Sequence, residues 1–484
     1  MSSNSADESQ DKVYGVVIIG AGIAGLTVAE TLTAAGFEDF LILEASNRIG
    51  GRCRTEDFGS SFVELGANWI HGTTSENSVM VLAEENDLAI KHQLMNRARG
   101  HFYRSNGRQI DKELGAKVWT LCKEIEAEVE TGHPCPSKGD KTVFTMKDYY
   151  VKRLEENLIK FQGAERPDVI AIFNCFSNYL RFHWGGEIAH IPLELCSMTP
   201  ETEGGDVLIP KGTRSLVNAI LSRFRCEGRL YTEKQATSIS WGDDLVEVRC
   251  SSGDIYRAKC VVITVSLGYL KEHHRDLFQP SIPHDKIKAI DGLDFGLVDK
   301  IFLHYDHPFW SSEVGFGSVK LAWDDDEAVI TDPENQWYKR IFSFDDVYFN
   351  PSCLCVWISC NEAYHMEHLS EEDISETCTS LLRQFLGDPS IPKPSKVIWS
   401  TWGTNQHTLG SYSCLGMRSD ASHFGCLAEP LTDSNGRLRV LFAGEATHTK
   451  YHSTMHGARE SGVREATRLL RYFGGIKAPT KHLE

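Results

Sequence analysis

The sequence predicts an α/β protein with two domains, and three observations support that fold class. Near the N-terminus an apolar strand runs into a glycine-rich turn and a helix, and a second apolar strand that ends in an acidic residue follows. Strand and turn features of the same kind return twice later in the chain. The length of 484 residues exceeds what one ordinary hydrophobic core serves, so a second domain is expected.

The first unit carries glycines at the spacing of a dinucleotide-binding turn. Residues 16–19 form an apolar run typical of a buried parallel strand, and Gly20, Gly22 and Gly25 follow at GxGxxG spacing before an amphipathic helix. Gly20 permits the tight turn, Gly22 lets the backbone approach a pyrophosphate, and Gly25 lets the helix pack closely on the strand. The N–H groups at the helix N-terminus then face the phosphates. This pattern predicts a Rossmann-like domain, with a glycine-rich turn that binds no ligand as the alternative.

An acidic residue follows at the place where such a domain binds ribose. The strand at residues 40–43 ends in Glu44, about 20 residues beyond the last glycine. A carboxylate there accepts hydrogen bonds from the adenosine ribose hydroxyl groups. It would repel a 2′-phosphate, so FAD or NAD is expected rather than NADP.

Further charged residues favour FAD over NAD. Arg48, Gly51 and Arg52 follow the acidic residue closely, and guanidinium groups can offset pyrophosphate charge or hydrogen-bond the ribityl chain. Glu445 follows the later strand at residues 438–442, where a carboxylate can hold ribityl hydroxyls. An NAD site has no obvious use for these additions. The alternative is that both arginines lie on the surface and that Glu445 is a charge at a helix start.

The chain alternates between two kinds of segment. Residues 75–206 have helical and irregular patterns, nucleotide-domain strands return over residues 207–266, and residues 267–396 hold a second block of strands and a helix. Two insertions into a discontinuous nucleotide domain explain this order. The predicted FAD-binding domain therefore comprises residues 1–74, 207–266 and 397–484, and the inserted α+β substrate domain comprises residues 75–206 and 267–396.

The composition limits the partners of the protein. Hydrophobic residues make up 41% and charged residues 24% of the chain, as in a soluble globular protein. The formal net charge of −17 argues against nucleic acid and favours small cationic molecules. The longest apolar stretch is broken by glycines, so no membrane span is expected. The 14 cysteines lack metal-ligand spacing, so reduced thiols and no metal site are expected.

The N-terminal residues predict a location. Residues 1–12 are polar and acidic and lack the apolar core of a secretory signal, so a cytoplasmic protein is expected. A peroxisomal location is the alternative if the native C-terminus is missing. A monomer or a weak homo-oligomer is expected.

Several motifs of the chain resemble those of the flavin amine oxidase family. The resemblance covers residues 16–473 in the family's order and is greatest to the animal polyamine oxidases, which act on N1-acetylpolyamines or spermine. It implies FAD, hydride transfer from the α-carbon of an amine to the flavin, reoxidation of the flavin by O₂ to give H₂O₂, and hydrolysis of the imine to an aldehyde and a shorter amine. The motifs are RIGGRCRT, LGANWIHG, LVDKIFLHY with PFW, GSYS, and LFAGEATH with STMHGA.

The resemblance assigns two catalytic residues. Lys300 matches the family lysine that holds a water against flavin N5, where an ammonium would stabilise negative charge as electrons pass to O₂. The alternative is a lysine that extends along the strand face to solvent. His71 matches a family histidine at the substrate entrance of the flavin pocket, and a structural histidine is its alternative.

Four further residues match substrate positions. Trp69 and Tyr412 could form apolar walls around a methylene chain and make cation–π contact with an ammonium, although core packing explains them too. Ser453 and Thr454 match positions near the far end of the substrate, where a hydroxyl can bond an amine or an acetamide. Capping of the helix that begins near Gly457 is the alternative for this pair.

Departures from the family pattern leave the substrate open. His452 stands where polyamine oxidases have a tyrosine, Met455 replaces a threonine, Ser266 replaces a proline, and residues 406–409 differ before Gly410. The expected substrates are spermine, spermidine or their N1-acetylated forms. A flavin oxidase of another amine, such as a monoamine, and a catalytically weak flavin-binding protein are the alternatives.

The attachment of the flavin is also predicted. Monoamine oxidases carry their flavin on a cysteine near the GSYS region, and Cys414 does not lie at the matching place. FAD is therefore expected to be bound without a covalent link.

Overall fold

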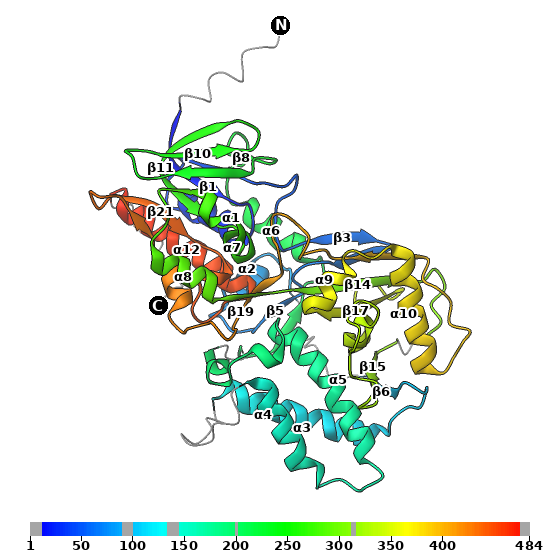
Figure 1. The fold of residues 1–484 in the computed structure, drawn as a ribbon. Coiled ribbons are helices and arrows are strands. Elements are labelled where there is room, and N and C mark those ends of the chain that lie inside the picture. Colours follow the sequence, from blue (N-terminus) through cyan, green and yellow to red (C-terminus); the bar gives the residue numbers. More distant parts are fainter. Residues whose placement is uncertain (1–11, 90–99, 133–144, 199–201, 311–315, 475–484) are drawn as a thin grey trace, which may run out of the picture.

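The computed structural model describes residues 12–89, 100–132, 145–198, 202–310 and 316–474. Figure 1 shows two parts. One part is a large sheet built from an early, a middle and a late segment of the chain, and the other is a smaller sheet beside three long helices, α3, α4 and α5.

The large sheet is centred on the N-terminal strand. β1 (Val13–Ile19) pairs in parallel with β2 (Phe40–Leu43) on one side and with β11 (Ile255–Ile263) on the other. β11 also pairs in parallel with β21 (Leu438–Phe442), so three separated segments of the chain meet in one sheet. The remaining strands of this sheet are β8 (Leu230–Tyr231), β9 (Ala236–Ser240), β10 (Val246–Cys250), β12 (Phe278–Gln279) and β20 (Leu431–Thr432).

Helices cover both faces of this sheet, because alternate strand residues supply two apolar surfaces. Val16 and Ile18 of β1 face one core, whereas Val17 and Ile19 face the other. The first core lies under α1 (Ile23–Ala34), α2 (Ser78–Glu85), α6 (Thr213–Leu221) and α12 (Met455–Tyr472). The second lies under α7 (Leu267–Leu277), α8 (His284–Gly292) and α11 (His423–Ala428).

The smaller sheet has six strands and is centred on β14 (Val298–His304). The other strands are β6 (His101–Arg104), β15 (Ser318–Ala322), β16 (Ser343–Asp346), β17 (Cys353–Ser359) and β18 (Lys396–Trp399). The core on one face includes α3 (Lys112–Glu130), α4 (Met146–Leu158) and α5 (Arg166–Trp184). The core on the other face includes α9 (Cys360–Met366) and α10 (Glu371–Leu386).

Three two-stranded ribbons and four short 3-10 helices complete the described elements. The ribbons are β3 (Thr55–Phe58) with β4 (Ser61–Glu64), β5 (Trp69–His71) with β7 (Asp206–Leu208), and β13 (Asp294–Gly296) with β19 (Tyr412–Cys414). The 3-10 helices are η1 (Ile188–His190), η2 (Leu193–Met198), η3 (Trp337–Arg340) and η4 (Glu445–Thr447). Among the described helices, none is both long and apolar enough to cross a membrane.

The borders between the two parts differ from the expected domain boundaries. Residues 267–293 were expected in the substrate domain, but their apolar side chains pack in the second core of the large sheet. Ser266 explains the difference, because its hydroxyl accepts a hydrogen bond from the N–H of Tyr269 at 3.0 Å and starts α7 directly after β11. Conversely, β18 was expected mostly in the FAD-binding domain and instead pairs with β14 in the smaller sheet.

The contact between α1 and β1 leaves no room for a side chain at Gly25. A Cβ atom there would lie 2.0 Å from the carbonyl oxygen of Gly20. We expect Gly25→Ala to lower the free energy of unfolding by about 3 kcal/mol, because backbone atoms of helix and strand would have to separate. Denaturant unfolding measures the change.

Gly163→Ala is the matched control, because its Cβ would meet no atom within 4 Å. A Gly25→Ala protein as stable as this control would contradict the close packing of helix on strand.

Candidate functional site

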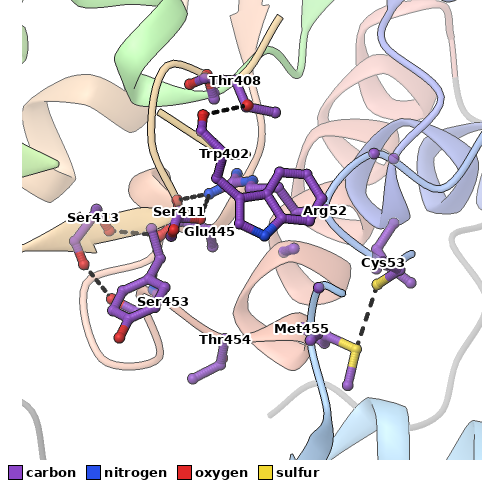
Figure 2. Close-up of a pocket in the computed structure, with 18 of the residues that line it drawn as sticks. Arg52, Cys53, Trp402, Thr408, Ser411, Ser413, Glu445, Ser453, Thr454 and Met455 are labelled. Atoms are coloured by element: carbon purple, nitrogen blue, oxygen red, sulfur yellow. Dashed lines mark hydrogen bonds and ion pairs between the residues drawn. The ribbon is translucent and has the colours of Figure 1, made fainter. Parts of the chain in front are cut away.

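A cavity of about 790 Å³ is lined by residues of both sheets. It extends from the glycine turn after β1, past β14 and β17, to α3 and α5. Figure 2 shows side chains along part of its wall, with Arg52, Glu445 and Ser413 joined by hydrogen bonds. The carboxyl ends of β1 and β2 open onto this cavity, which is where ligands bind in open α/β sheets.

The predicted glycines shape one end of the cavity. Gly20 has φ +107°, and a Cβ there would lie 2.5 Å from Oγ1 of Thr264. A Cβ at Gly22 would meet nothing within 4 Å, and no side chain caps the start of α1. Gly51 packs against Gly22, because its Cβ would lie 3.4 Å from the Gly22 Cα. The uncapped helix N-terminus and the bare backbone therefore fit a pyrophosphate.

Glu44 lines the same end and holds the glycine turn. One carboxylate oxygen accepts a hydrogen bond from the N–H of Ala21 at 2.8 Å. The other accepts from the N–H and the hydroxyl of Ser46, at 2.9 and 2.7 Å. These bonds orient the carboxylate at the cavity wall, as a ribose-binding residue requires.

Arg48 lies at the cavity wall and donates to backbone carbonyls. Its nearest acceptor is the carbonyl of Gly51 at 2.7 Å. Burial, with a further effect of the nearby Arg54, lowers the pKa of Arg48. Arg48 thus holds the backbone at Gly51 in place. A direct contact between its guanidinium and a pyrophosphate stays a prediction.

Arg52 and Glu445 form an ion pair across the site. Arg52 Nη1 lies 2.8 Å from the Glu445 carboxylate and 2.8 Å from the carbonyl oxygen of Ser411. The other carboxylate oxygen of Glu445 accepts from the hydroxyl of Ser413 at 2.5 Å and from the N–H of Ser453 at 2.7 Å. Burial favours the neutral acid, but Arg52 and these donors outweigh it and lower the pKa of Glu445. Glu445 is the first residue of η4, as the helix-start alternative expected, and it is also paired with Arg52, whose side chain is only 25% exposed.

Lys300 lies on β14 with its ammonium buried at the cavity. Nζ donates to the carbonyl oxygens of Glu64 and Gly66, each at 2.6 Å, and lies 4.7 Å from the ring centroid of Trp357. Burial lowers the pKa of Lys300 to about 8. The residue is only 4% exposed, so the alternative of a lysine that reaches solvent is wrong. The ammonium has three donors, and one remains for a ligand or a water.

His71 pairs with a carboxylate that was not predicted. The ribbon of β5 and β7 places Asp206 directly opposite His71, with Nδ1 and Oδ1 2.8 Å apart, and both residues line the cavity. No carboxylate of the substrate site was assigned from the sequence. A polar residue at the start of a short apolar strand was the only signal of Asp206.

Aromatic rings line the cavity between Lys300 and α5. Trp69 stacks on Trp357 with ring centroids 5.3 Å apart, and Phe182 packs on the same ring at 4.5 Å. The hydroxyl of Tyr412 donates to the carbonyl oxygen of Phe182 at 2.8 Å. Both predicted aromatic residues are therefore at the cavity, where they pack with Phe182 and Trp357, which were not predicted.

Ser453 and Thr454 also line the cavity, but their hydroxyls have backbone partners. The hydroxyl of Ser453 donates to the carbonyl oxygen of Ser413. The hydroxyl of Thr454 donates to the carbonyl oxygen of Tyr451 at 2.7 Å. It also accepts from the N–H of Gly457 at 3.0 Å, and this second bond caps the N-terminus of α12. The capping alternative thus describes Thr454, and substrate contact by either hydroxyl stays a prediction.

The far end of the cavity holds charged side chains that were not predicted. Glu130 and Lys123 of α3 and His183 of α5 line it, and the buried Glu126 lies behind them. Nε2 of His183 lies 3.5 Å from one oxygen of Glu126 and 3.7 Å from one of Glu130, and Lys123 pairs with Glu126. Burial raises the pKa of Glu130, against the opposing effect of Lys123.

This cluster provides ligand atoms for a cation. Oxygens of Glu126 and Glu130 and a nitrogen of His183 lie within 4.8 Å of one another. No metal site was expected from the sequence, since the three residues are spread over two helices and have no metal-ligand spacing. Because Lys123 already neutralises Glu126, Glu130 is the carboxylate of the cluster that faces the cavity.

Comparison with known proteins agrees with this geometry. The chain is 33% identical to the peroxisomal N(1)-acetyl-spermine/spermidine oxidase of Homo sapiens, over 94% of both chains. It is 31% identical to the protein of that name from Bos taurus, again over 94% of both chains. A solved structure of a putrescine oxidase double mutant, redesigned in its cofactor binding, superposes with a TM-score of 0.70, covering 95% of this chain and 99% of that one at 17% identity.

The putrescine oxidase likeness shows the fold, a Rossmann-like FAD domain with an inserted substrate domain. The family model of flavin containing amine oxidoreductases matches residues 23–470, which include the whole of the smaller sheet, every strand of the large sheet except β1, and most of the residues that line the cavity. The chain therefore belongs to the flavin containing amine oxidoreductase family and uses FAD as its cofactor.

Proposed function

We propose that the enzyme oxidises polyamines, namely spermine, spermidine or their N1-acetylated forms, at the expense of O₂. The observation that carries the proposal is one cavity with a cation-binding group at each end of an aromatic passage. Asp206 lines the cavity beside His71 of β5, and Glu130 lines it beside His183 of α5. A polyamine carries several ammonium groups along an apolar chain, and both features match it.

Each group at the cavity has a different role in such a reaction. Bound FAD supplies the acceptor for the hydride that leaves the carbon next to the amine nitrogen. Asp206 and His71 offer hydrogen-bond acceptors to the amine, and the rings of Trp69 and Trp357 keep water from the reacting carbon. The Lys300 ammonium faces the negative charge that develops as O₂ is reduced. Amine, O₂ and water thereby give an aldehyde, a shorter amine and H₂O₂.

One experiment tests the proposal and its rivals. The purified FAD-bound protein is mixed without oxygen with polyamines, N1-acetylpolyamines and monoamines, and the loss of flavin absorbance is followed. Bleaching by polyamines or their acetylated forms supports the proposal. Bleaching by monoamines alone would overturn the substrate, and no bleaching by any amine would favour a flavin-binding protein without this activity.

Lys300 predicts a pH dependence of the step with O₂. The ammonium form dominates below its pKa of about 8, and only that form stabilises developing negative charge. The rate constant for reoxidation of the reduced enzyme should therefore fall as the pH rises through about 8. Lys300→Met should retain FAD, reoxidise about 100-fold more slowly at neutral pH and lose this pH dependence. Stopped-flow mixing with O₂ measures both, and unchanged reoxidation would exclude the role.

Glu130 predicts a preference for substrates with a second cation. Glu130→Gln removes the charge with little change of shape, so the KM for a polyamine should rise about tenfold with little change in kcat. A monoamine cannot reach both ends of the cavity, and its KM should not change. Glu124→Gln, on the exposed side of the same helix, is the control. Equal effects on polyamine and monoamine would argue against a second cation site.

We further propose that FAD is held without a covalent bond. Cys53 and Cys414 both line the cavity, and burial raises the pKa of both thiols, that of Cys53 to about 12. Since the thiolate is the nucleophile, neither cysteine is activated for flavin attachment. Acid precipitation should release the flavin into the supernatant, and flavin that stays with the pellet would contradict this proposal.

The location and assembly of the enzyme are proposals as well. We propose a cytoplasmic location, whereas the two mammalian relatives carry the word peroxisomal in their names. Imaging of the tagged protein in cells decides between these compartments. We propose a monomer or a weak homo-oligomer, which light scattering over a range of concentrations checks.

A further inference from the structure

Two buried carboxyl groups lie in contact beneath the lysine strand, and the chemistry above uses neither. Asp299 directly precedes Lys300 on β14 and is fully buried. Glu367 follows α9 and is also buried. Both side chains bind the same short segment, since Asp299 accepts hydrogen bonds from Ser400 and Trp402 and Glu367 accepts from Gly403 and Thr404. Two ionised carboxylates held so close together in a buried place would repel each other. One of them therefore carries a proton.

The partners of each oxygen identify the protonated group. Both oxygens of Glu367 accept backbone N–H groups, from Gly403 and from Thr404, each at 2.6 Å. Oδ1 of Asp299 accepts from the hydroxyl of Ser400 at 2.5 Å, while the buried Oδ2 has no N–H or O–H partner among the described residues. Oδ2 is thus the atom with room for a proton, and Glu367 is the acceptor.

We propose that protonated Asp299 and ionised Glu367 form a clamp on residues 400–404, which positions Lys300 and Trp402 at the flavin cavity. Here the clamp means these two carboxyl groups and the proton between them. Asp299 and Glu367 are positioning residues, because they act on the cavity through the segment they hold.

The hydrogen bonds of that segment show what the clamp positions. Ser400 pairs with Lys300 in both directions, through its hydroxyl at 2.9 Å and its N–H at 3.0 Å. Trp402 donates its indole N–H to the carbonyl oxygen of Leu65 at 2.9 Å. Lys300 Nζ holds the carbonyls of Glu64 and Gly66 on either side of it. Both residues therefore fix the same three-residue stretch of the cavity wall.

The surroundings of Asp299 favour its neutral form. Burial, followed by the contact with Glu367, raises the pKa of Asp299 well above its ordinary value, against the hydrogen bonds from Ser400 and Trp402. The other titratable groups nearby are Lys300, on the same strand, and Tyr364 of α9, whose ring packs at Gly403. Ionisation of Asp299 at high pH would place two carboxylates in contact and release the segment.

Two amide variants give opposite expectations. Asp299→Asn puts an NH₂ donor at the place of the proton, so FAD affinity should stay within about threefold of wild type. Glu367→Gln puts an NH₂ group against the N–H of Gly403 or Thr404, so FAD affinity should fall about tenfold or more. Flavin fluorescence on titration of the apoprotein measures both. A tolerated Glu367→Gln together with a damaging Asp299→Asn would overturn the proton assignment.

A spectroscopic readout and a pH profile separate the clamp from ordinary packing. The infrared spectrum should show the C=O band of a buried carboxylic acid at neutral pH, and Asp299→Asn should remove it. FAD affinity should decrease at alkaline pH in wild type and in Lys300→Met, which lacks the lysine titration, but not in Asp299→Asn. Absence of the acid band, or the same alkaline loss in Asp299→Asn, would exclude the clamp.

Discussion

The buried ammonium of Lys300 is the interaction on which the site depends. It joins a strand of the smaller sheet to the carbonyl groups of Glu64 and Gly66, which belong to the chain segment that leads from the large sheet. A buried ammonium that is hydrogen-bonded to carbonyl oxygens has a lower pKa than one that is paired with a carboxylate. The same contact thus joins β14 to residues 64–66 and places a positive charge at the cavity.

A second ionic contact at the cavity, between Arg52 and Glu445, differs in kind. Arg52 and Glu445 come from segments far apart in the sequence, and both remain charged although the carboxylate is buried. The bonds from Ser413 and Ser453 to the carboxylate offset its loss of hydration. The cavity therefore holds a carboxylate whose pKa is lowered and an ammonium whose pKa is lowered to about 8.

The local parts of the site could be predicted from the sequence and the long-range parts could not. Gly20, Gly22, Gly25 and Glu44 are readable because a strand, a turn and a helix place them within one short segment. Asp206 lies beside His71 only because β5 pairs with β7. The hydrophobic pattern within either segment does not predict that pairing. Glu130, on a helix with an ordinary amphipathic pattern, is likewise indistinguishable from a solvated acid until α5 is placed beside it.

The domain borders were wrong for a related reason. The start of α7 at Ser266 turns the chain back onto the large sheet, while the pattern of residues 267–293 is equally consistent with a new domain. The resemblance to known oxidases identified Lys300 and its strand, whereas the proton shared by Asp299 and Glu367 depends on two elements that meet only in the fold.

The ribbon of β5 and β7 has a consequence for how such enzymes diversify. The residues between these strands, which include α3, α4 and α5, begin and end at adjacent points, because β5 pairs with β7. Their length and composition are thus free to vary while the nucleotide-binding half keeps its geometry. In this architecture the residues that select the amine can change independently of the FAD-binding domain. A new substrate specificity can therefore evolve while the redox chemistry is retained.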